Sequence, residues 1–104
     1  MKTELKLGKN RGKPRIWIEG RALLAAGFAP GMAFHARFSP ARITLTAGAG
    51  EGMKSRTVSG KIRASGPHPI IDINSMEIFF ALPGVARISV EMGEGIITIL
   101  PSFL

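Results

Sequence analysis

The side chains of this sequence that could do chemistry are mostly cationic, and they gather in its first two thirds. Residues 1–63 hold 13 Lys and Arg against 3 Asp and Glu, a net +10, whereas residues 64–104 hold 1 against 4, a net −3. Clustered Lys and Arg bind polyanions because they displace condensed counterions from phosphates. The pattern therefore predicts contact with DNA or RNA through the first part of the chain. The alternative, an inert solvated basic surface, stays open.

Twelve residues are candidates for this contact. Four of them alternate within residues 8–15, GKNRGKPR, where glycines and a proline disfavour a helix and predict a flexible basic arm or loop. A tryptophan follows, which could stack on a base or, as most Trp residues in small domains do, serve packing. The candidates are Lys9, Arg11, Lys13, Arg15, Trp17, Arg21, Arg37, Arg42, Lys54, Arg56, Lys61 and Arg63.

Groups for acid–base or metal chemistry are few. The sequence has no cysteine and two histidines, which excludes disulfides and thiolate sites and predicts no metal and no cofactor. Metal-free cleavage of RNA needs a general base and acid beside the 2′-hydroxyl, and the groups available are His35, Glu19 and His68. Their spacing singles out no pair, so catalytic residues stay unassigned. His35 is expected to be an ordinary residue on the surface of a strand.

The elements that would position these groups follow from the hydrophobic pattern. Ile16 and Ile18 alternate with polar neighbours as in a strand, and residues 20–28 hold good helix formers that end at Gly27. Two alternating segments then predict a hairpin over residues 32–47. The first unit is therefore a strand, a helix of about two turns and a hairpin.

The same order recurs over residues 69–100. Apolar residues of the first stretch match apolar residues of the second at a constant offset in residue number, as Ile16 matches Ile71. Past a one-residue deletion, a slightly smaller shift matches Ile43 with Ile97. The two stretches share a pattern of apolar residues and almost no surface residues, which favours an internal duplication.

The second helix is expected over residues 76–82, where Asn74 and Glu77 resemble a capping box. Within this helix, Phe79 and Phe80 cannot easily both face one small core. An exposed phenylalanine here would favour a module that binds another protein, for example a host protein.

A chain of 104 residues is large enough for one modest core and too small for two. We expect a single domain, 1–104, with the first unit at 14–47, a basic Gly-rich linker at 48–68 that includes a short strand over 56–64, and the second unit at 69–100. No apolar run is long enough for a membrane helix, and the first residues lack the apolar segment of a signal peptide. The sequence predicts a cytoplasmic protein with no membrane partner.

The stretch GRALLAAGFAPGMAFHARFSPARITLTA, which begins at Gly20, carries a family resemblance that extends back to Pro14. Residues 14–47 resemble the SymE-type toxin family, whose members have a basic strand, a helix ending in AAGF or EAGF, a turn and a hairpin. That family resembles the AbrB and MazE swapped-hairpin superfamily. The resemblance implies a mainly β fold with two short helices, an AbrB-like swapped-hairpin barrel built here as a single-chain pseudo-dimer.

The resemblance also implies functions. Members of the superfamily are DNA-binding regulators or antitoxins, and SymE-like proteins act on RNA or on nucleoid DNA. By position, Arg15, Trp17 and Arg21 would contact nucleic acid. The second unit departs from this pattern because Asp72 and Glu77 lie near the corresponding positions.

Three functions stay open at this point. The first is a nucleic-acid-binding protein that contacts phosphates through its basic N-terminal half. The second is an RNA-cleaving toxin, an endoribonuclease by resemblance only. The third is a phage or mobile-element module that acts on a host protein, and the partner could also be a second copy of the chain in a homodimer.

Overall fold

A computed structural model of the chain describes residues 2–50, 52 and 54–103. This part of the chain is mainly β with two short helices, as the sequence predicts. The first half holds β1 (Lys2–Lys6), β2 (Gly8–Asn10), β3 (Lys13–Glu19), α1 (Arg21–Ala25), β4 (Ala33–Ser39) and β5 (Arg42–Ala47). The second half holds β6 (Arg56–Thr57), β7 (Ser59–Arg63), β8 (Gly66–Asn74), α2 (Glu77–Ala81), β9 (Arg87–Gly93) and β10 (Ile96–Pro101).

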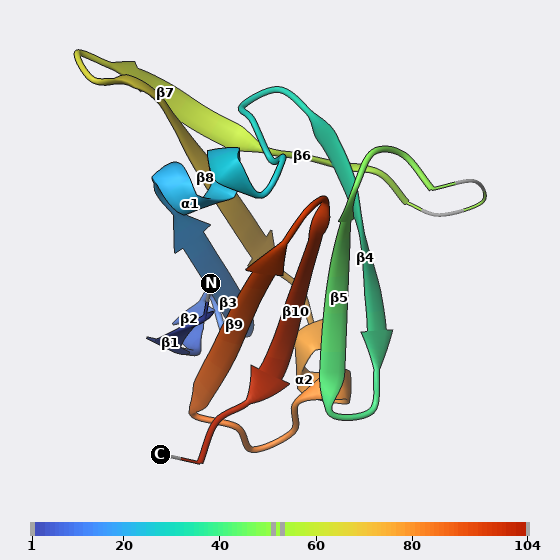
Figure 1. Cartoon of the computed structure of the whole chain (residues 1–104). Helices are drawn as coiled ribbons and strands as arrows, with labels where there is room; N and C mark the ends of the chain where they lie inside the picture. The colour runs from blue at the N-terminus through green and yellow to red at the C-terminus, as the bar shows by residue number, and fades with distance from the viewer. Residues whose placement is uncertain (1, 51, 53, 104) are drawn as a thin grey trace.

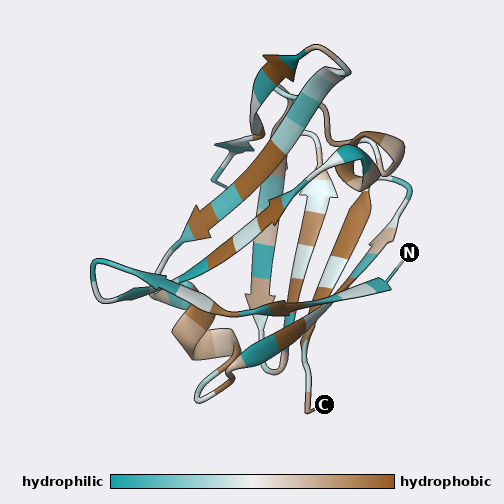
Figure 2. Ribbon diagram, turned by 90° about the vertical axis from the view of Figure 1, so that its left-hand side faces the viewer, coloured by the Kyte–Doolittle hydropathy of each residue, from teal (hydrophilic) through white to brown (hydrophobic). Residues whose placement is uncertain are grey.

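The strands form two sheets that share one core. The larger sheet has the order β1-β9-β10-β5-β4-β6, and the smaller has the order β2-β3-β8-β7. Apolar residues alternate along the strands of both sheets (Figure 2), and the buried ones belong to a single cluster. Neither helix of the described residues is long and apolar enough to cross a membrane. Figure 1 shows α1 and α2 near opposite ends of the molecule.

The two halves pair with each other at the centre of each sheet. In the smaller sheet, β3 runs antiparallel to β8 with Trp17 opposite Asp72, two positions related by the same shift as Ile16 and Ile71. In the larger sheet, β5 runs antiparallel to β10 with Thr44 opposite Thr98, which are related by the shift that matches Ile43 with Ile97. Each central pair thus joins like positions of the two halves. This register places a pseudo-two-fold axis through the middle of both sheets.

Backbone hydrogen bonds outside the sheets are related by the same pseudo-two-fold axis. Gly20 N donates to Pro69 O at 3.2 Å, and Ser75 N donates to Pro14 O at 3.3 Å. The two bonds are equivalent in the two halves, because the offset in residue number that relates Gly20 to Ser75 also relates Pro14 to Pro69. Each bond ties the start of one helix segment to the first long strand of the other half.

The repeat extends further toward the N-terminus than the apolar pattern indicates. Leu7 N donates to Ala86 O at 2.9 Å, and Val58 N donates to Met32 O at 2.8 Å. Leu7 follows edge strand β1, and Val58 follows edge strand β6, so these two strands are also counterparts. The same holds for β2 and β7, which form the two edges of the smaller sheet.

The expectation of a flexible arm at residues 8–15 is wrong. These residues form the hairpin of β2 and β3, closed by a two-residue turn at Arg11 and Gly12, whose φ angles are 52° and 77°. Positive φ at both central positions is the type I′ geometry that matches the twist of a two-stranded hairpin. The pairing of Lys9 with Pro14 fixes its register.

The segment expected as a basic Gly-rich linker, 48–68, contains strands β6 and β7 and the first residues of β8. Residues 51 and 53 of this segment lie outside the described residues. Strand β7 is exposed along its whole length and is held by its pairing with β8. A strand of this kind has no buried side chains of its own, so it leaves no hydrophobic alternation in the sequence.

The start of α2 also differs from the expected capping box. The Asn74 side chain donates to the carbonyl oxygens of Lys13 and Pro14, at 3.3 and 3.1 Å, and so joins β8 to β3. The Glu77 amide donates instead to Ser75 Oγ at 3.2 Å. A local hydroxyl therefore satisfies a free amide at the start of the helix.

Candidate nucleic-acid interface

The outer face of the smaller sheet presents a tryptophan beside an arginine. Trp17 points away from the core because Ile16 and Ile18 on either side of it point inward, and 42% of its surface stays exposed. The Arg15 guanidinium carbon lies 4.6 Å from the centroid of the Trp17 ring. A cation at this distance is attracted to the electrons of the ring face. The pair forms a partly exposed platform in the centre of the face.

Asp72 holds this arginine in place. Arg15 donates from Nε to Oδ1 at 2.8 Å and from its terminal nitrogen to Oδ2 at 2.9 Å, a two-pronged ion pair. The hydrogen bonds with Asp72 raise the pKa of the Arg15 guanidinium, so its charge is permanent. Because the carboxylate neutralises much of that charge, Arg15 has less left to offer a phosphate than an unpaired arginine has.

A second polar pair lies beside the platform. His68 Nε2 is 2.9 Å from Glu19 Oε2. The pKa of Glu19 is lowered mainly by the hydrogen bond from His68 and secondly by one from Trp17. The charge of Arg63 adds to this effect. Glu19 is therefore a carboxylate over the whole neutral range. When His68 donates from Nε2 and is neutral, its Nδ1 is left as a proton acceptor.

Strand β7 adds two cations to the same face. Lys61 lies opposite His68 on β8, and Arg63 lies opposite Gly66. These positions share a face with Trp17 because side chains alternate along β8 between residues 66 and 72. No ion pair of Lys61 or Arg63 occurs in the described part of the chain.

The structure brings together about half of the residues that the sequence singles out. Lys13, Arg15, Trp17, Lys61 and Arg63 share the outer face of the smaller sheet by register. Arg21 lies at the rim of this face, where its terminal nitrogen donates to Ser65 O at 3.1 Å in the turn between β7 and β8. We call these six residues the basic face.

Six other candidates lie elsewhere. Arg37 and Arg42 are exposed on β4 and β5 of the larger sheet. Lys9, Arg11, Lys54 and Arg56 are scattered. Lys9 lies opposite buried Pro14 and therefore points away from the basic face, Arg11 lies in the turn of the β2–β3 hairpin, Lys54 precedes β6, and the Arg56 side chain is 4.0 Å from Glu77. The sequence therefore predicts that the surface is basic, but it does not predict which face of the fold carries each charge.

The histidines also separate. His35 Nδ1 donates to Gly48 O at 3.1 Å on the larger sheet, whereas Glu19 and His68 belong to the smaller sheet. The sequence names all three groups without a pairing, because only the register of β3 on β8 and of β8 on β7 brings Glu19 and His68 together. The described residues hold no group of three or more acidic or imidazole side chains that could bind a metal ion.

No protein-family model, curated protein or solved structure matches the chain significantly.

Proposed function

We propose that the chain is a nucleic-acid-binding module that contacts phosphates through the basic face. The observation that carries this proposal is the shared outer face, which holds Lys13, Lys61 and Arg63 together with the exposed Trp17. Lysine and arginine supply the phosphate contacts, and an exposed aromatic ring supplies a stacking surface for a base. Few other side chains on this face could read base edges, so we expect weak sequence preference.

We further propose that the two halves correspond to the two protomers of an AbrB-like swapped-hairpin dimer, joined in one chain. The pairing of like strands, β3 with β8 and β5 with β10, supports this relation. The resemblance of residues 14–47 to SymE-type toxins fits the same relation. The two halves would not bind alike, because Asp72 stands at the position that corresponds to Trp17.

A salt-dependent titration tests the binding. Labelled single- and double-stranded DNA and RNA of one arbitrary sequence are titrated with the protein, and the sole tryptophan gives an independent fluorescence signal from the proposed contact. We expect binding that weakens steeply with salt, because each phosphate contact adds about one to the slope of log K against log salt concentration. Absence of binding to all four ligands at low salt would contradict the proposal.

Matched variants locate the contact. The double variant Lys61→Ser/Arg63→Ser removes two charges from the basic face, and Arg37→Ser/Arg42→Ser removes two charges from the larger sheet. The first should reduce the salt slope by about two, whereas the second should change it little. Equal losses from both variants would show that net charge alone, and not the basic face, drives binding.

Cleavage of RNA is a second candidate function, favoured by the contact between Glu19 and His68. A carboxylate that orients an imidazole prepares it as a general base, and Lys61 on the paired strand could stabilise a phosphorane. His68 would take the proton of the 2′-hydroxyl as its oxygen attacks phosphorus. The P–O5′ bond then breaks, and the 5′-oxygen takes a proton from solvent, which leaves a 2′,3′-cyclic phosphate and a 5′-hydroxyl.

A cleavage assay separates this function from binding. Wild type, His68→Ala and the control His35→Ala are incubated with labelled single-stranded RNA. Cleavage that His68→Ala abolishes and His35→Ala retains would support the second function. No cleavage by the wild type, or equal rates in all three proteins, would remove it and leave simple binding.

A further inference from the structure

Helix α2 carries large apolar side chains on both of its faces. Ile78 and Ala81 are buried in the core, as the fold requires. On the outer side, Phe79 and Phe80 are 56% and 88% exposed, and Met76 just before the helix is 53% exposed. The expectation that the two phenylalanines do not both enter the core is confirmed. Positions 76, 79 and 80 are neighbours on a helical surface, so the three side chains form one apolar stripe.

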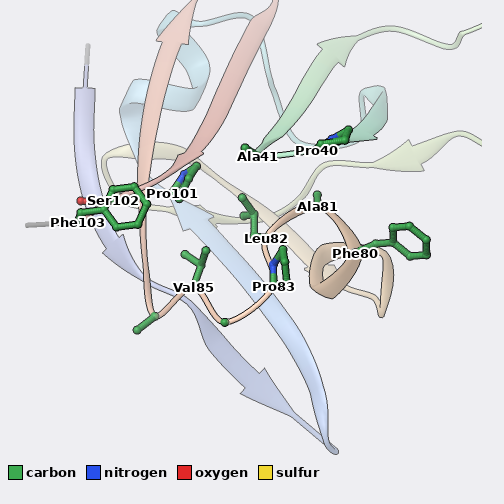
Figure 3. A pocket seen from close by; sticks show the side chains of 12 residues that line it. Pro40, Ala41, Phe80, Ala81, Leu82, Pro83, Val85, Pro101, Ser102 and Phe103 are labelled. Atoms are coloured by element: carbon green, nitrogen blue, oxygen red, sulfur yellow. The ribbon is translucent and has the colours of Figure 1, made fainter.

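Two grooves lie beside Phe80, whereas Met76 and Phe79 line a third hollow together with Lys9. One, of about 350 Å³, lies between Phe80 and the β4–β5 turn at Ser39 and Pro40. The other, of about 560 Å³, continues from Pro40 past Leu82 to Phe103, which is 91% exposed. Figure 3 shows Phe80 at one end of the larger groove, pointing outward, and Phe103 at its other end. We call the stripe and the two grooves the α2 face.

The other end of the molecule shows that the fold does not need these side chains. A groove lies there between α1 and the β9–β10 turn, and its lining residues are the counterparts of those in the smaller groove of the α2 face. Ala25 stands where α2 has Phe80, and Glu94 stands where the β4–β5 turn has Pro40. The same architecture is therefore complete with a small and a charged residue at these places, and the apolar residues of the α2 face call for another explanation.

We propose that the α2 face binds a second copy of this chain through a two-fold contact. An interface of this kind must be self-complementary, with a projection and a hollow on one surface. Phe80 is such a projection, and the two grooves that it lines are such hollows. A phenylalanine from one copy fits the groove of the other, and the reverse contact follows from the symmetry.

The apolar area fits a dimer. The exposed parts of Met76, Phe79, Phe80 and Phe103 amount to about 500 Å². A stable interface buries about 800 Å² on each partner, and homodimers make about two thirds of this area apolar. The α2 face by itself thus provides the apolar part of such an interface, and an exposed apolar patch of this size is often functional.

The distribution of charge favours a dimer in which the two copies meet through their α2 faces. The chain carries +7, so two copies repel each other unless their basic parts stay apart. Among the described residues no Lys or Arg lines the two grooves of the α2 face, and Glu77, which lines the smaller one, lies 4.0 Å from Arg56. The basic face is on the outer side of the smaller sheet, built largely from β3 and β7. Contact through α2 therefore keeps the most basic surfaces apart.

Sedimentation equilibrium over a range of protein concentrations tests the proposal. Wild type should approach twice the chain mass of 11.1 kDa. Phe80→Ala should weaken the association at least tenfold, because it removes the projecting side chain. Alanine occupies the corresponding position in α1, so this variant should keep the fold, which circular dichroism and thermal melting check. Ile62→Ala is the matched control, because Ile62 is 83% exposed on β7, away from the α2 face.

The outcomes distinguish a second copy of the chain from a different partner at the α2 face. A dimer that Phe80→Ala weakens and Ile62→Ala leaves intact supports the proposal. A wild-type protein that stays at one chain mass up to about 100 µM overturns it and leaves the face to a different partner. A dimer that both variants retain also overturns it, because its contact would then lie elsewhere on the chain.

Discussion

The guanidinium of Arg15 has two neighbours on the outer face of the smaller sheet, Trp17 and Asp72. It stacks on Trp17, it donates two hydrogen bonds to Asp72, and it lies on the face that would meet a phosphate. Since Asp72 already satisfies its charge, the main effect of Arg15 is to fix the orientation of the tryptophan ring. Lys61 and Arg63, which form no ion pair among the described residues, are better placed to bind phosphate.

The sequence indicates the types of these residues and misses their pairing. Trp17 points outward, as its place between two isoleucines that alternate with it indicates. That Asp72 stands opposite it follows only from the register of β3 on β8, a contact between the two halves of the chain that no local pattern encodes. The sequence alone therefore does not show that Asp72 belongs to the same face as Trp17, because this depends on how the two halves pair.

The contact between Glu19 and His68 makes stability depend on pH. The hydrogen bond from His68 is the main cause of the lowered pKa of Glu19 in the folded chain. A carboxyl with a depressed pKa contributes stability that is present above its unfolded pKa of 4.5 and is lost as the pH falls through its lower folded pKa. Glu19→Gln should therefore remove part of the acid sensitivity of unfolding between about pH 5 and pH 3.

Urea denaturation of wild type and Glu19→Gln at several pH values measures this difference. The variant should be less stable than the wild type at pH 7, and the gap should narrow on acidification. Glu91→Gln is a matched control, because Glu91 is an exposed carboxylate on β9 of the larger sheet. A constant gap between wild type and Glu19→Gln at all pH values would show that the contact with His68 does not act through charge.

At the scale of elements, strands with one buried face are clear in the sequence, whereas exposed strands are only weakly indicated. β5 and β10 bury alternate residues and are clear in the sequence. β2 and β7 are exposed edge strands that exist because β3 and β8 offer hydrogen-bonding partners. The residues around β2 are expected as an arm or loop, and β7 falls within the short strand expected over 56–64 of the linker. These two strands carry several of the cations, so the position of the charges could not be predicted either.

Gly60 shows how β7 is held in place. A Cβ atom on Gly60 would lie 2.6 Å from Pro30 Cγ and 2.8 Å from His68 O, so the chain can approach here only because glycine has no side chain. Its counterpart on β2 is Lys9, since the two residues pair with Pro69 and Pro14 respectively. The larger and the smaller residue are exchanged in the other half, where Lys9 and Gly84, the counterpart of Pro30, line the same hollow.

Gly60→Ala should destabilise the protein by about 1–3 kcal/mol, the usual cost of forcing an extra methyl group into a packed contact. The midpoint of urea denaturation measures this change. Ser59→Ala, at the neighbouring exposed position of β7, should have little effect. A Gly60→Ala variant as stable as the wild type would mean that β7 does not pack against the segment around Pro30.

At the scale of the whole molecule, neither half can complete a sheet by itself. The central pair of the smaller sheet joins β3 to β8, that of the larger sheet joins β5 to β10, and β1 at one edge pairs with β9. The apolar alternation and its nearly constant shift between the halves indicate two similar units from the sequence. They do not show where each unit begins, because the early strands of both units carry too few buried residues.

Cutting the chain between β5 and β6 therefore tests the pseudo-two-fold arrangement. A protease site introduced there gives two halves, and we expect neither to show a cooperative melting transition as a monomer, because each exposes the apolar face that the other covers. Mixed in equal amounts, they should regain the circular dichroism spectrum of the intact chain. Their melting temperature should now rise with concentration, since a contact within one chain has become an association between two. An isolated half that melts sharply at the mass of one half would contradict this arrangement, because its core would then not depend on the strands of the other.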